Sequence, residues 1–427
     1  MAIPTLAMIP SGYKAGKLYS VLPSDGTGDF TVARNSVATR VNQSGLIEEV
    51  GVNVPRLDYS AGGCPVLLTE IQSQNKITYS EDFSNSVWDN SSQVTRTANA
   101  TISPDGTLNA FNIKPTNVNS NHTLRAQNLG GFTSGSVVNA SFFAKQNGYK
   151  YISVIGGFGS SNTPSVIFNL EDGLIESGTG TIENYGNGWY RCIAPITLNS
   201  TSLYCVATIL NDNLLGSFVG DNVKGVYVYG FQIEQQPAAT SYIKSNIGSA
   251  TTREADLVNG AGSAATFNSL EHTFFVDLNS MFQSGTTSAI SIVGSTGTVS
   301  SNRIMILKQA NNTDVTFQIK SGGATAATET LSNIDSSVRQ KLVITVKLNE
   351  VKYYRNGFLF ATDTGTIPLP VSLGEITLTS GTTGSPLFGD TKDIRYYNQV
   401  LTAAETLELM SYDSFNEMAS ALQYTIK

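Results

Sequence analysis

The sequence predicts an all-β protein made of tandem antiparallel β-sandwiches, with a loop-rich N-terminal region and a short C-terminal helix. Charged residues make up only 14% of the chain and glycine occurs 39 times, a composition typical of many short strands joined by turns. Short runs rich in β-branched and aromatic residues alternate with turn groups such as Glu171-Asp172-Gly173. Apolar residues recur at convincing helical spacing in one place, near the C-terminus.

The length of the chain predicts several domains, because 427 residues exceed the roughly 250 that a single hydrophobic core usually holds. Changes of pattern along the chain divide it into four expected segments. These are an N-terminal attachment and oligomerisation region at 1–75, a first sandwich at 76–256, a second sandwich at 257–400 and a helical tail at 401–427.

The N-terminal region is organised around residues 33–70, where glycines interrupt apolar residues and Pro55 and Pro65 exclude a helix. Arg40 and Arg56 stand among apolar neighbours, and we interpret them as members of fixed polar pairs because a buried arginine needs a partner. The acids nearby in sequence are Glu48, Glu49 and Asp58. Two surface arginines are the alternative interpretation. Such a loop-rich region rarely has its own core, so we expect it to lie against another domain or subunit.

The strands of both sandwiches are predicted from their composition and from the turns between them. In the first sandwich they are 140–145, 151–155, 165–170, 189–195, 203–209 and 226–234. In the second they are 272–278, 289–293, 303–307, 315–319, 340–348, 351–355 and 358–361. Asn356-Gly357 separates the last two runs and is a strong signal for a two-residue hairpin.

The tail is predicted to be helical from Thr402 to Leu422. Thr402 and Glu405 form a capping box, and apolar residues follow at helical spacing. This helix either covers the second sandwich or associates with other copies of the chain about a symmetry axis.

Several phrases near the N-terminus resemble the N-terminal region of a family of bacteriophage virion proteins, usually labelled head or tail fibre proteins. They are IPSGYK at 9–14, KLYSVLPSDGTGDF at 17–30, ATRVN at 38–42, GLIEEV at 45–50 and NVPRLDY at 53–59. The resemblance implies a protein of the virion that contacts other virion proteins and forms a homotrimer.

The two sandwiches carry resemblances of their own. The phrases SEDFSNSVW at 80–88, SPDGTLNAF at 103–111, NGWYR at 187–191 and the ending at 231–256 are similar to jelly rolls of the carbohydrate-binding-module type. Lys244 departs from that pattern, since family members often have proline there. The second strand series, closed by a strand at 393–397 and the helix after it, resembles the concanavalin-A-like or laminin-G-like sandwich.

The residues of the chain give little support to catalysis or nucleic-acid binding. The net charge is −7, and lysines and arginines are scattered rather than striped. His122 and His272 are far apart, and neither lies in a zinc motif. The carboxylate pattern of the concanavalin-A-like glucanases is incomplete after Glu254 and Asp256, so we expect no enzymatic activity.

The cysteines lack the paired spacing of a zinc site, and we expect buried free thiols. A bridge between Cys192 and Cys205 is the alternative.

Aromatic side chains that border turns, or that point outward from strands, are the candidates for glycan binding. They are Trp88, Tyr149, Tyr151, Tyr185, Tyr354 and Tyr396. Trp189 is interpreted as a core residue instead. For the pairs Tyr353-Tyr354 and Tyr396-Tyr397, period-two alternation predicts one ring inside the sandwich and one outside.

No organic cofactor is expected, and a structural calcium ion remains open. Its candidate ligands are Glu81, Asp82 and Glu234, where the first and last jelly-roll strands are expected to converge. Ordinary solvated carboxylates are the alternative interpretation.

The sequence thus predicts a virion structural protein, a fibre or appendage subunit of head or tail whose sandwiches adhere to host-surface or environmental glycans. It is expected to be made in the host cytoplasm and exposed on the phage particle, with no nucleic acid bound and no membrane insertion. A capsid decoration or connector protein without glycan binding is the alternative, and a glycan depolymerase is a weaker one.

Overall fold

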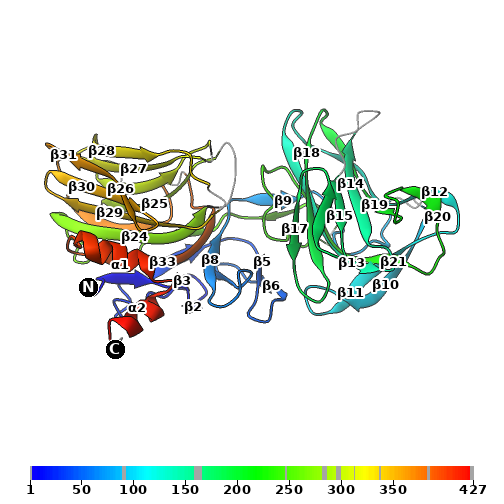
Figure 1. Cartoon of the computed structure of the whole chain (residues 1–427), viewed down its shortest axis with the longest axis horizontal. Helices are drawn as coiled ribbons and strands as arrows, with labels where there is room; N and C mark the ends of the chain where they lie inside the picture. The colour runs from blue at the N-terminus through cyan, green and yellow to red at the C-terminus, as the bar shows by residue number, and fades with distance from the viewer. Residues whose placement is uncertain are drawn as a thin grey trace. The chain divides into compact units, whose positions relative to one another are not determined.

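The chain was analysed as a computed structural model, which describes residues 2–88, 93–157, 166–245, 248–280, 286–294, 300–311, 313–335, 338–381 and 385–423. Strands dominate these residues, and the helices among them lie near the C-terminus (Figure 1). The predicted all-β fold is confirmed. Within the same residues, no helix has the length and apolarity needed to cross a membrane.

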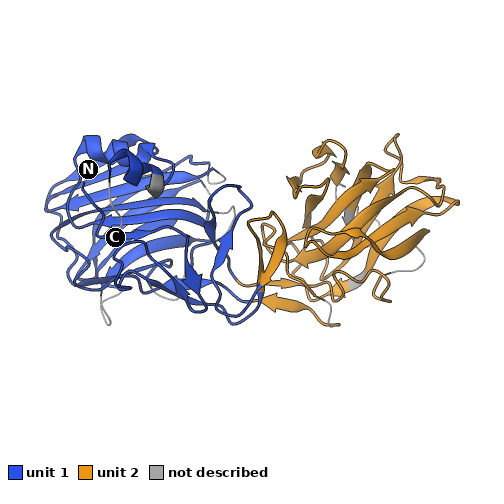
Figure 2. Ribbon diagram, turned by 90° about the horizontal axis from the view of Figure 1, so that it is seen from below, with its two compact units in different colours: residues 1–37, 50–71, 254–427 blue, residues 38–49, 72–253 orange. Residues whose placement is uncertain are grey.

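The chain folds into two compact units, coloured separately in Figure 2. Unit 1 consists of Met1–Val37, Val50–Ile71 and Glu254–Lys427, and unit 2 consists of Ala38–Glu49 and Gln72–Arg253. This division differs from the four expected segments. The N-terminal region has no body of its own but is shared between the two units, and the C-terminal tail belongs to unit 1.

Unit 2 contains a jelly roll of two six-stranded sheets. The first sheet has the order β10 (Val94–Ile102), β11 (Leu108–Pro115), β21 (Gly225–Glu234), β13 (Val137–Asn147), β18 (Tyr190–Thr197) and β17 (Thr181–Asn184). The second has the order β16 (Leu174–Ser177), β15 (Val166–Asn169), β14 (Tyr151–Gly157), β19 (Ser202–Leu210), β12 (Asn119–Gly130) and β20 (Ser217–Val219). Strands β11, β13, β18 and β21 of the first sheet alternate along the chain with β12, β14 and β19 of the second, which gives the jelly-roll connectivity. The main core of unit 2 includes Phe142, Phe231 and Trp88.

Unit 1 is the predicted concanavalin-A-like sandwich. Its larger sheet has the order β31 (Phe358–Thr364), β30 (Glu350–Arg355), β29 (Gln340–Lys347), β24 (Glu271–Ser280), β33 (Gly389–Tyr397), β8 (Val66–Thr69) and β7 (Arg56–Asp58), and β1 (Leu6–Met8) also pairs with β33. The five-stranded sheet has the order β28 (Ala324–Leu331), β27 (Val315–Ser321), β26 (Arg303–Lys308), β25 (Ser288–Gly294) and β32 (Leu373–Thr377). The main core contains the inward side chains of both sheets, among them Phe274, Ile292 and Phe317.

Smaller sheets are built largely from the N-terminal region. They are β2 (Tyr13–Lys14), β3 (Lys17–Leu18), β4 (Phe30–Ala33) and β23 (Leu257–Asn259) in one sheet, β5 (Ala38–Val41) with β6 (Ile47–Val50), and β9 (Ser73–Asn75) with β22 (Thr251–Arg253). Because β1, β7 and β8 extend the large sheet of unit 1, the N-terminal region does lie against another domain, as expected.

The predicted hairpin at Asn356-Gly357 is confirmed. Arg355 is paired with Phe358, and the two turn residues have φ angles of 46° and 86°. Both angles are positive, which is the condition for the type I′ turn that Asn-Gly favours.

The C-terminal tail forms two helices rather than one, α1 (Ala403–Ser411) and α2 (Phe415–Ala421). The predicted capping box of Thr402 and Glu405 begins α1. Ser414 caps a second helix start by accepting a hydrogen bond from the Glu417 backbone, which explains the interruption. Buried side chains of both helices, including Met410 and Met418, pack with residues of the large sheet. The tail therefore covers the sandwich, the first of its two predicted roles.

The predicted arginine pairs are partly confirmed. Arg40 Nε donates to Glu48 Oε2 at 3.0 Å, as expected. Arg56 pairs with Glu70 and Asp256, which were not among the expected partners. Asp256 is 200 residues away along the chain, so local sequence could not identify it.

A buried charge network in unit 1 joins Arg34, Arg56, Glu70 and Asp256. Arg56 Nη1 donates to Glu70 Oε2 at 2.6 Å, Arg56 Nη2 donates to Asp256 Oδ2, and Arg34 Nη1 donates to Asp256 Oδ1 at 2.8 Å. Burial alone lowers the pKa of Arg56, but the charges of Asp256 and Glu70 outweigh burial and raise it. The two carboxylates thus favour the charged form of Arg56, as a buried arginine requires.

The network lies where the chain passes between units. Arg34, Glu70 and Asp256 are each within three residues of a point where the chain leaves or enters unit 1. Arg34 also donates to the carbonyls of Gly51 and Val54, close to a further crossing point. The four side chains thus fix the unit 1 ends of the connecting segments.

The three cysteines are free thiols, and Cys192 and Cys205 are buried as expected. Cys64 corrects the expectation, because it is exposed. It follows Gly62 and Gly63, whose positive φ angles form a tight turn outside the strands.

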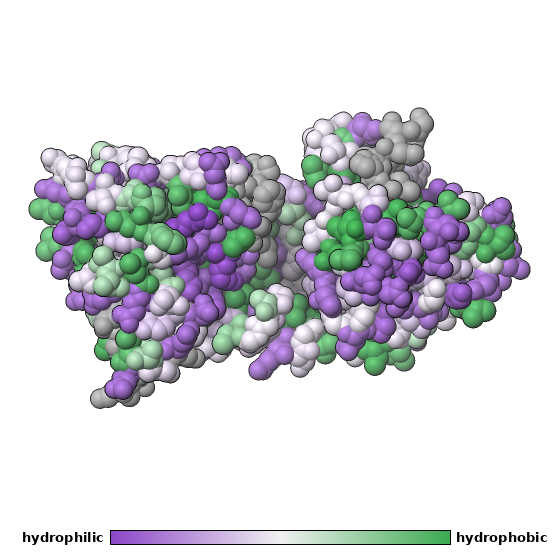
Figure 3. All heavy atoms as spheres, viewed as in Figure 1, coloured by the Kyte–Doolittle hydropathy of each residue, from purple (hydrophilic) through white to green (hydrophobic). Residues whose placement is uncertain are grey.

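On the face shown in Figure 3, hydrophilic and hydrophobic residues are interspersed over each unit.

We predict that Arg56→Met destabilises unit 1 by about 3–5 kcal/mol, because it leaves Glu70 without its buried cation. Urea unfolding followed by far-ultraviolet circular dichroism measures this. Lys150→Met is the control, since it removes a partly exposed ion pair with Glu171 and is expected to cost less than about 1 kcal/mol. Equal losses in both variants would contradict a structural role for the network.

Candidate glycan-binding surface

Three of the six predicted glycan-binding aromatics are buried, which corrects their assignment. Trp88 is 0% exposed, and its Nε1 donates to the Tyr79 carbonyl at 3.1 Å. Tyr354 is 2% exposed and Tyr396 is 0% exposed. None of the three rings can stack on a glycan.

The two tyrosine errors have different causes: Tyr396 is the inward ring of its pair, whereas the outward ring of Tyr354 is covered. Alternation places Tyr396 in the main core and Tyr354 on the outer face, as period two requires. The outer face around Tyr354, however, is not in solvent, because residues of α1, α2 and the N-terminal segment pack over it. Tyr354 is therefore part of a second core.

Tyr149 and Tyr151 lie together at the start of β14 and are partly exposed. The Lys150 ammonium lies 5.2 Å from the centre of the Tyr151 ring and 3.0 Å from Glu171 Oε2. The Tyr149 ring contacts Phe218, with 5.3 Å between the ring centres. A positive charge therefore already lies over Tyr151, and Tyr149 is partly used in packing.

Tyr185 belongs to an aromatic cluster on the outer face of the first jelly-roll sheet. Its ring centre is 4.9 Å from that of Phe143, in an edge-to-face arrangement. Trp189 is buried in the same cluster, as the sequence indicated. Tyr185 and Tyr227 are the partly exposed members, so they form the open margin of the cluster.

Tyr227 was not identified from the sequence. It lies on β21 between Val226 and Val228, which are both buried in the main core, so its ring points to the outer face. In register, Tyr227 is paired with Asn112 on β11 and with Lys145 on β13. An aromatic ring flanked by an amide and an amine is the combination that glycan sites use for stacking and hydrogen bonding.

The space beside Tyr227 depends on a glycine. A Cβ atom on Gly225 would lie 2.3 Å from Asn112 Oδ1, so any larger residue would displace the amide. Asn112 Oδ1 has no hydrogen-bond partner within the part of the chain that the structure describes. We name Asn112, Tyr227 and Lys145 the β21 platform. Its sequence signal was the alternation of valine and tyrosine in VYVY at 226–229.

The calcium candidates do not converge. Glu81 Oε1 accepts hydrogen bonds from Tyr229 Oη at 2.8 Å and Tyr242 Oη at 3.0 Å, and Glu81 Oε2 pairs with Lys244 at 3.0 Å. Asp82 accepts a hydrogen bond from the Ser84 backbone within its own turn.

Glu234 is fully buried and serves a structural network. It accepts hydrogen bonds from Ser73 Oγ at 2.6 Å and from Gln232 Nε2 at 2.6 Å. Among the described residues, no group of three or more His, Cys, Asp or Glu side chains is arranged to hold a metal ion. The three candidate carboxylates are thus engaged by protein groups rather than gathered around a common point.

Acidic residues do gather on β24 and β33 of unit 1, where a depolymerase would need a carboxylate pair. Burial and the charges of Asp277 and Asp58 raise the pKa of Asp390, although Arg339 lowers it. Arg339 donates to both Asp277 and Asp390. Because one guanidinium bridges the two carboxylates, the group is an ion network and not the open acid pair of a glycosidase.

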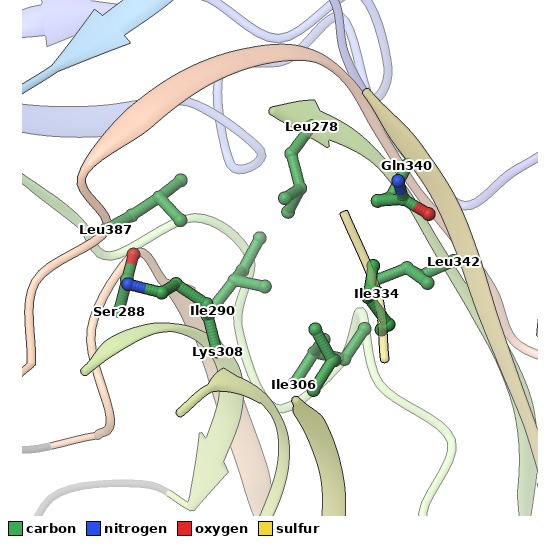
Figure 4. A pocket seen from close by; sticks show the side chains of 10 residues that line it. Leu278, Ser288, Ile290, Ile306, Lys308, Ile334, Gln340, Leu342 and Leu387 are labelled. Carbon is green, nitrogen blue, oxygen red and sulfur yellow. The ribbon is translucent and has the colours of Figure 1, made fainter. Parts of the chain in front are cut away.

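A cavity of about 30 Å³ lies in the interior of unit 1 (Figure 4). Its lining is mostly apolar, with Lys308 as the charged member. Burial lowers the pKa of Lys308 to about 8, and its Nζ donates to the Thr286 carbonyl at 3.2 Å. The volume suits a molecule the size of water, so this cavity is too small for a sugar.

Comparisons with known proteins give partial similarities. No family model and no curated protein matches the sequence. A sialidase module (CBM40) from Ruminococcus gnavus, bound to α2,3-sialyllactose, is 17% identical, with 34% of this chain and 86% of that chain covered and a TM-score of 0.30. The Bacillus licheniformis β-glucanase is 18% identical, with 39% and 78% covered and a TM-score of 0.28.

Domain 4 of a Geobacillus stearothermophilus arabinanase, in complex with arabinotriose, is 16% identical, with 40% of this chain and 82% of that chain covered and a TM-score of 0.29. Because these TM-scores are low, we draw no conclusion about this chain from the similarities. The fold and the site rest on the topology and contacts given above.

Both histidines are buried and bonded to backbone carbonyls, as a structural role requires. Burial lowers the pKa of His272 to about 4, although its hydrogen bond with the Asn268 carbonyl acts the other way. The unfolded chain binds a proton at this position as the pH falls through about 6.5, whereas the folded chain does not until about pH 4.

We therefore predict that His272 makes the chain less stable as the pH falls from about 6.5 to about 4, by at most about 3 kcal/mol. The stability is complete above this window. Urea unfolding across the window, compared with His272→Gln, measures the effect, and the variant is expected to show a smaller loss. An unchanged pH dependence in the variant would contradict the assignment to His272.

Proposed function

We propose that this chain is a bacteriophage virion structural protein, a fibre or appendage subunit of head or tail, and that unit 2 adheres to glycans. The virion proposal rests on the N-terminal phrases that resemble phage fibre proteins. These phrases form strands of both units, so the resemblance concerns a folded part of the protein. No catalytic step is part of the proposal.

The β21 platform is the observation that carries glycan adhesion. Tyr227 offers a partly exposed ring on the outer face of a jelly-roll sheet, and Asn112 and Lys145 flank it in register. Stacking on one ring gives weak binding, but repeated copies on a particle gain strength through avidity. A homotrimer would place three platforms on each appendage.

A connector role is the second candidate, and exposed aliphatic side chains favour it. Val219 on β20 is 63% exposed, and Val223 after β20 is 73% exposed. Val118, which directly precedes β12, is 47% exposed. β12 and β20 are paired, so these valines lie on neighbouring backbone segments. Apolar groups gathered in this way are typical of protein contacts, here with other virion proteins.

We predict that Tyr227→Ala weakens glycan binding about fivefold, because loss of ring stacking costs about 1 kcal/mol. A glycan array with the full chain, followed by titration of the bound glycans, measures this. Tyr151→Ala on the opposite sheet is the control and is expected to bind normally. Trp88 and Trp189 both lie in unit 2, so their fluorescence verifies that unit 2 is folded.

Normal binding by Tyr227→Ala together with loss in Tyr151→Ala would move the site to the opposite sheet. Absence of any glycan binding would favour the connector role.

The homotrimer makes a separate prediction. Sedimentation equilibrium of the full chain should give three times the 45.5 kDa of one chain. A monomer at all concentrations would contradict the trimer and would remove the avidity argument, while leaving the single platform untouched.

A further inference from the structure

We infer that the β21 platform selects anionic sugars, those that carry a carboxylate, sulfate or phosphate group. The inference rests on the proposed glycan binding and adds the class of ligand. It is argued from two lysines on the outer face of the same sheet, Lys145 and Lys114.

Lys145 is fixed directly beside the stacking ring. It is the register partner of Tyr227, and neighbouring strands lie about 5 Å apart. Its side chain runs along the turn before β18, because Lys145 Cε lies 3.5 Å from the position that a Cβ on Gly188 would occupy. The apolar stem is thereby supported on the β18 side of β13, and the flexible end of the side chain carries the ammonium above the sheet face that Tyr227 shares.

Lys114 lies on the other side of the ring. It follows Ile113, whose register partner is Val226, so Lys114 is on the outer face next to Gly225. Lys114 Cγ lies 2.9 Å from the position of a Cβ on Gly225, so the absence of a side chain there makes room for the lysine stem. The two lysine backbones are two strand spacings apart across the sheet and two residues apart along it, about 12 Å in total.

Neither ammonium is neutralised by the protein, as far as the described residues show: every ion pair found among them involves other residues. On the same face, Glu81 forms an ion pair with Lys244, and Asp105 accepts a hydrogen bond from the Thr107 hydroxyl within its own turn. The chain as a whole carries −7. The surface around the partly exposed Tyr227 ring, with two lysines outside any ion pair found, is therefore locally positive although the chain is acidic overall.

A sugar ring stacked on Tyr227 would place its substituents between the two ammonium groups. A neutral sugar gains only hydrogen bonds there, whereas an anionic group gains charge-assisted hydrogen bonds, which are about twice as strong. The platform thus discriminates by charge, and each partly exposed lysine contributes a few-fold in affinity.

Titration of the full chain with matched pairs of probes tests the inference. The pairs are oligogalacturonate against its methyl ester, and lactose 3-sulfate against lactose, which separate carboxylate from sulfate recognition. We expect at least one anionic probe to bind about tenfold more tightly than its neutral partner, with a preference that weakens as salt is added. In Lys145→Gln the preference should fall about threefold or more, while binding of the neutral partner is unchanged.

Lys14→Gln, an exposed lysine of unit 1, is the control for the change in net charge. Salt dependence of the unmodified chain gives a second readout that needs no variant to fold. Equal binding of anionic and neutral probes, abolished by Tyr227→Ala, would overturn the inference and leave the proposed function standing. A preference that survives Lys145→Gln combined with Lys114→Gln would also overturn it. Absence of binding by all probes and by a glycan array would overturn both.

Discussion

The buried network of Arg34, Arg56, Glu70 and Asp256 is the constraint on which the arrangement of the chain depends. Its members come from three separate stretches of the sequence, and all four belong to unit 1. A buried arginine without its carboxylate is strongly unfavourable. The folded state of unit 1 therefore requires all three stretches to be in place together. The N-terminal region also adds strands β1, β7 and β8 to a sheet whose other strands come from the C-terminal half of the chain.

Covering of the outer sheet faces decides where unit 1 and unit 2 can bind a ligand. The large sheet of unit 1 loses its outer face to α1, α2 and the N-terminal segment, which buries Tyr354 and Tyr397. In unit 2 the aromatic cluster around Phe143 buries part of an outer face but leaves Tyr227 and Tyr185 partly exposed. The open margin of this cluster therefore combines partly exposed aromatic rings with the polar side chains of the β21 platform.

Features set by neighbouring residues could be predicted from the sequence, whereas features set by distant residues could not. The Asn356-Gly357 hairpin and the Thr402 capping box depend on a few adjacent residues, and both are confirmed. Alternation also predicted the strand that holds Tyr227. The burial of Tyr354 and the pairing of Arg56 with Asp256 depend on segments far along the chain, and alternation carries no information about what covers a sheet face.

The proposed function makes this chain part of a phage particle that presents the β21 platform to the outside. Electron cryomicroscopy of the purified particle, with the chain located and its copies counted, is the decisive measurement. We expect a projecting appendage in which Tyr227 and its neighbours face solvent. A chain enclosed by other virion proteins, with the platform covered, would contradict adhesion and leave a connector.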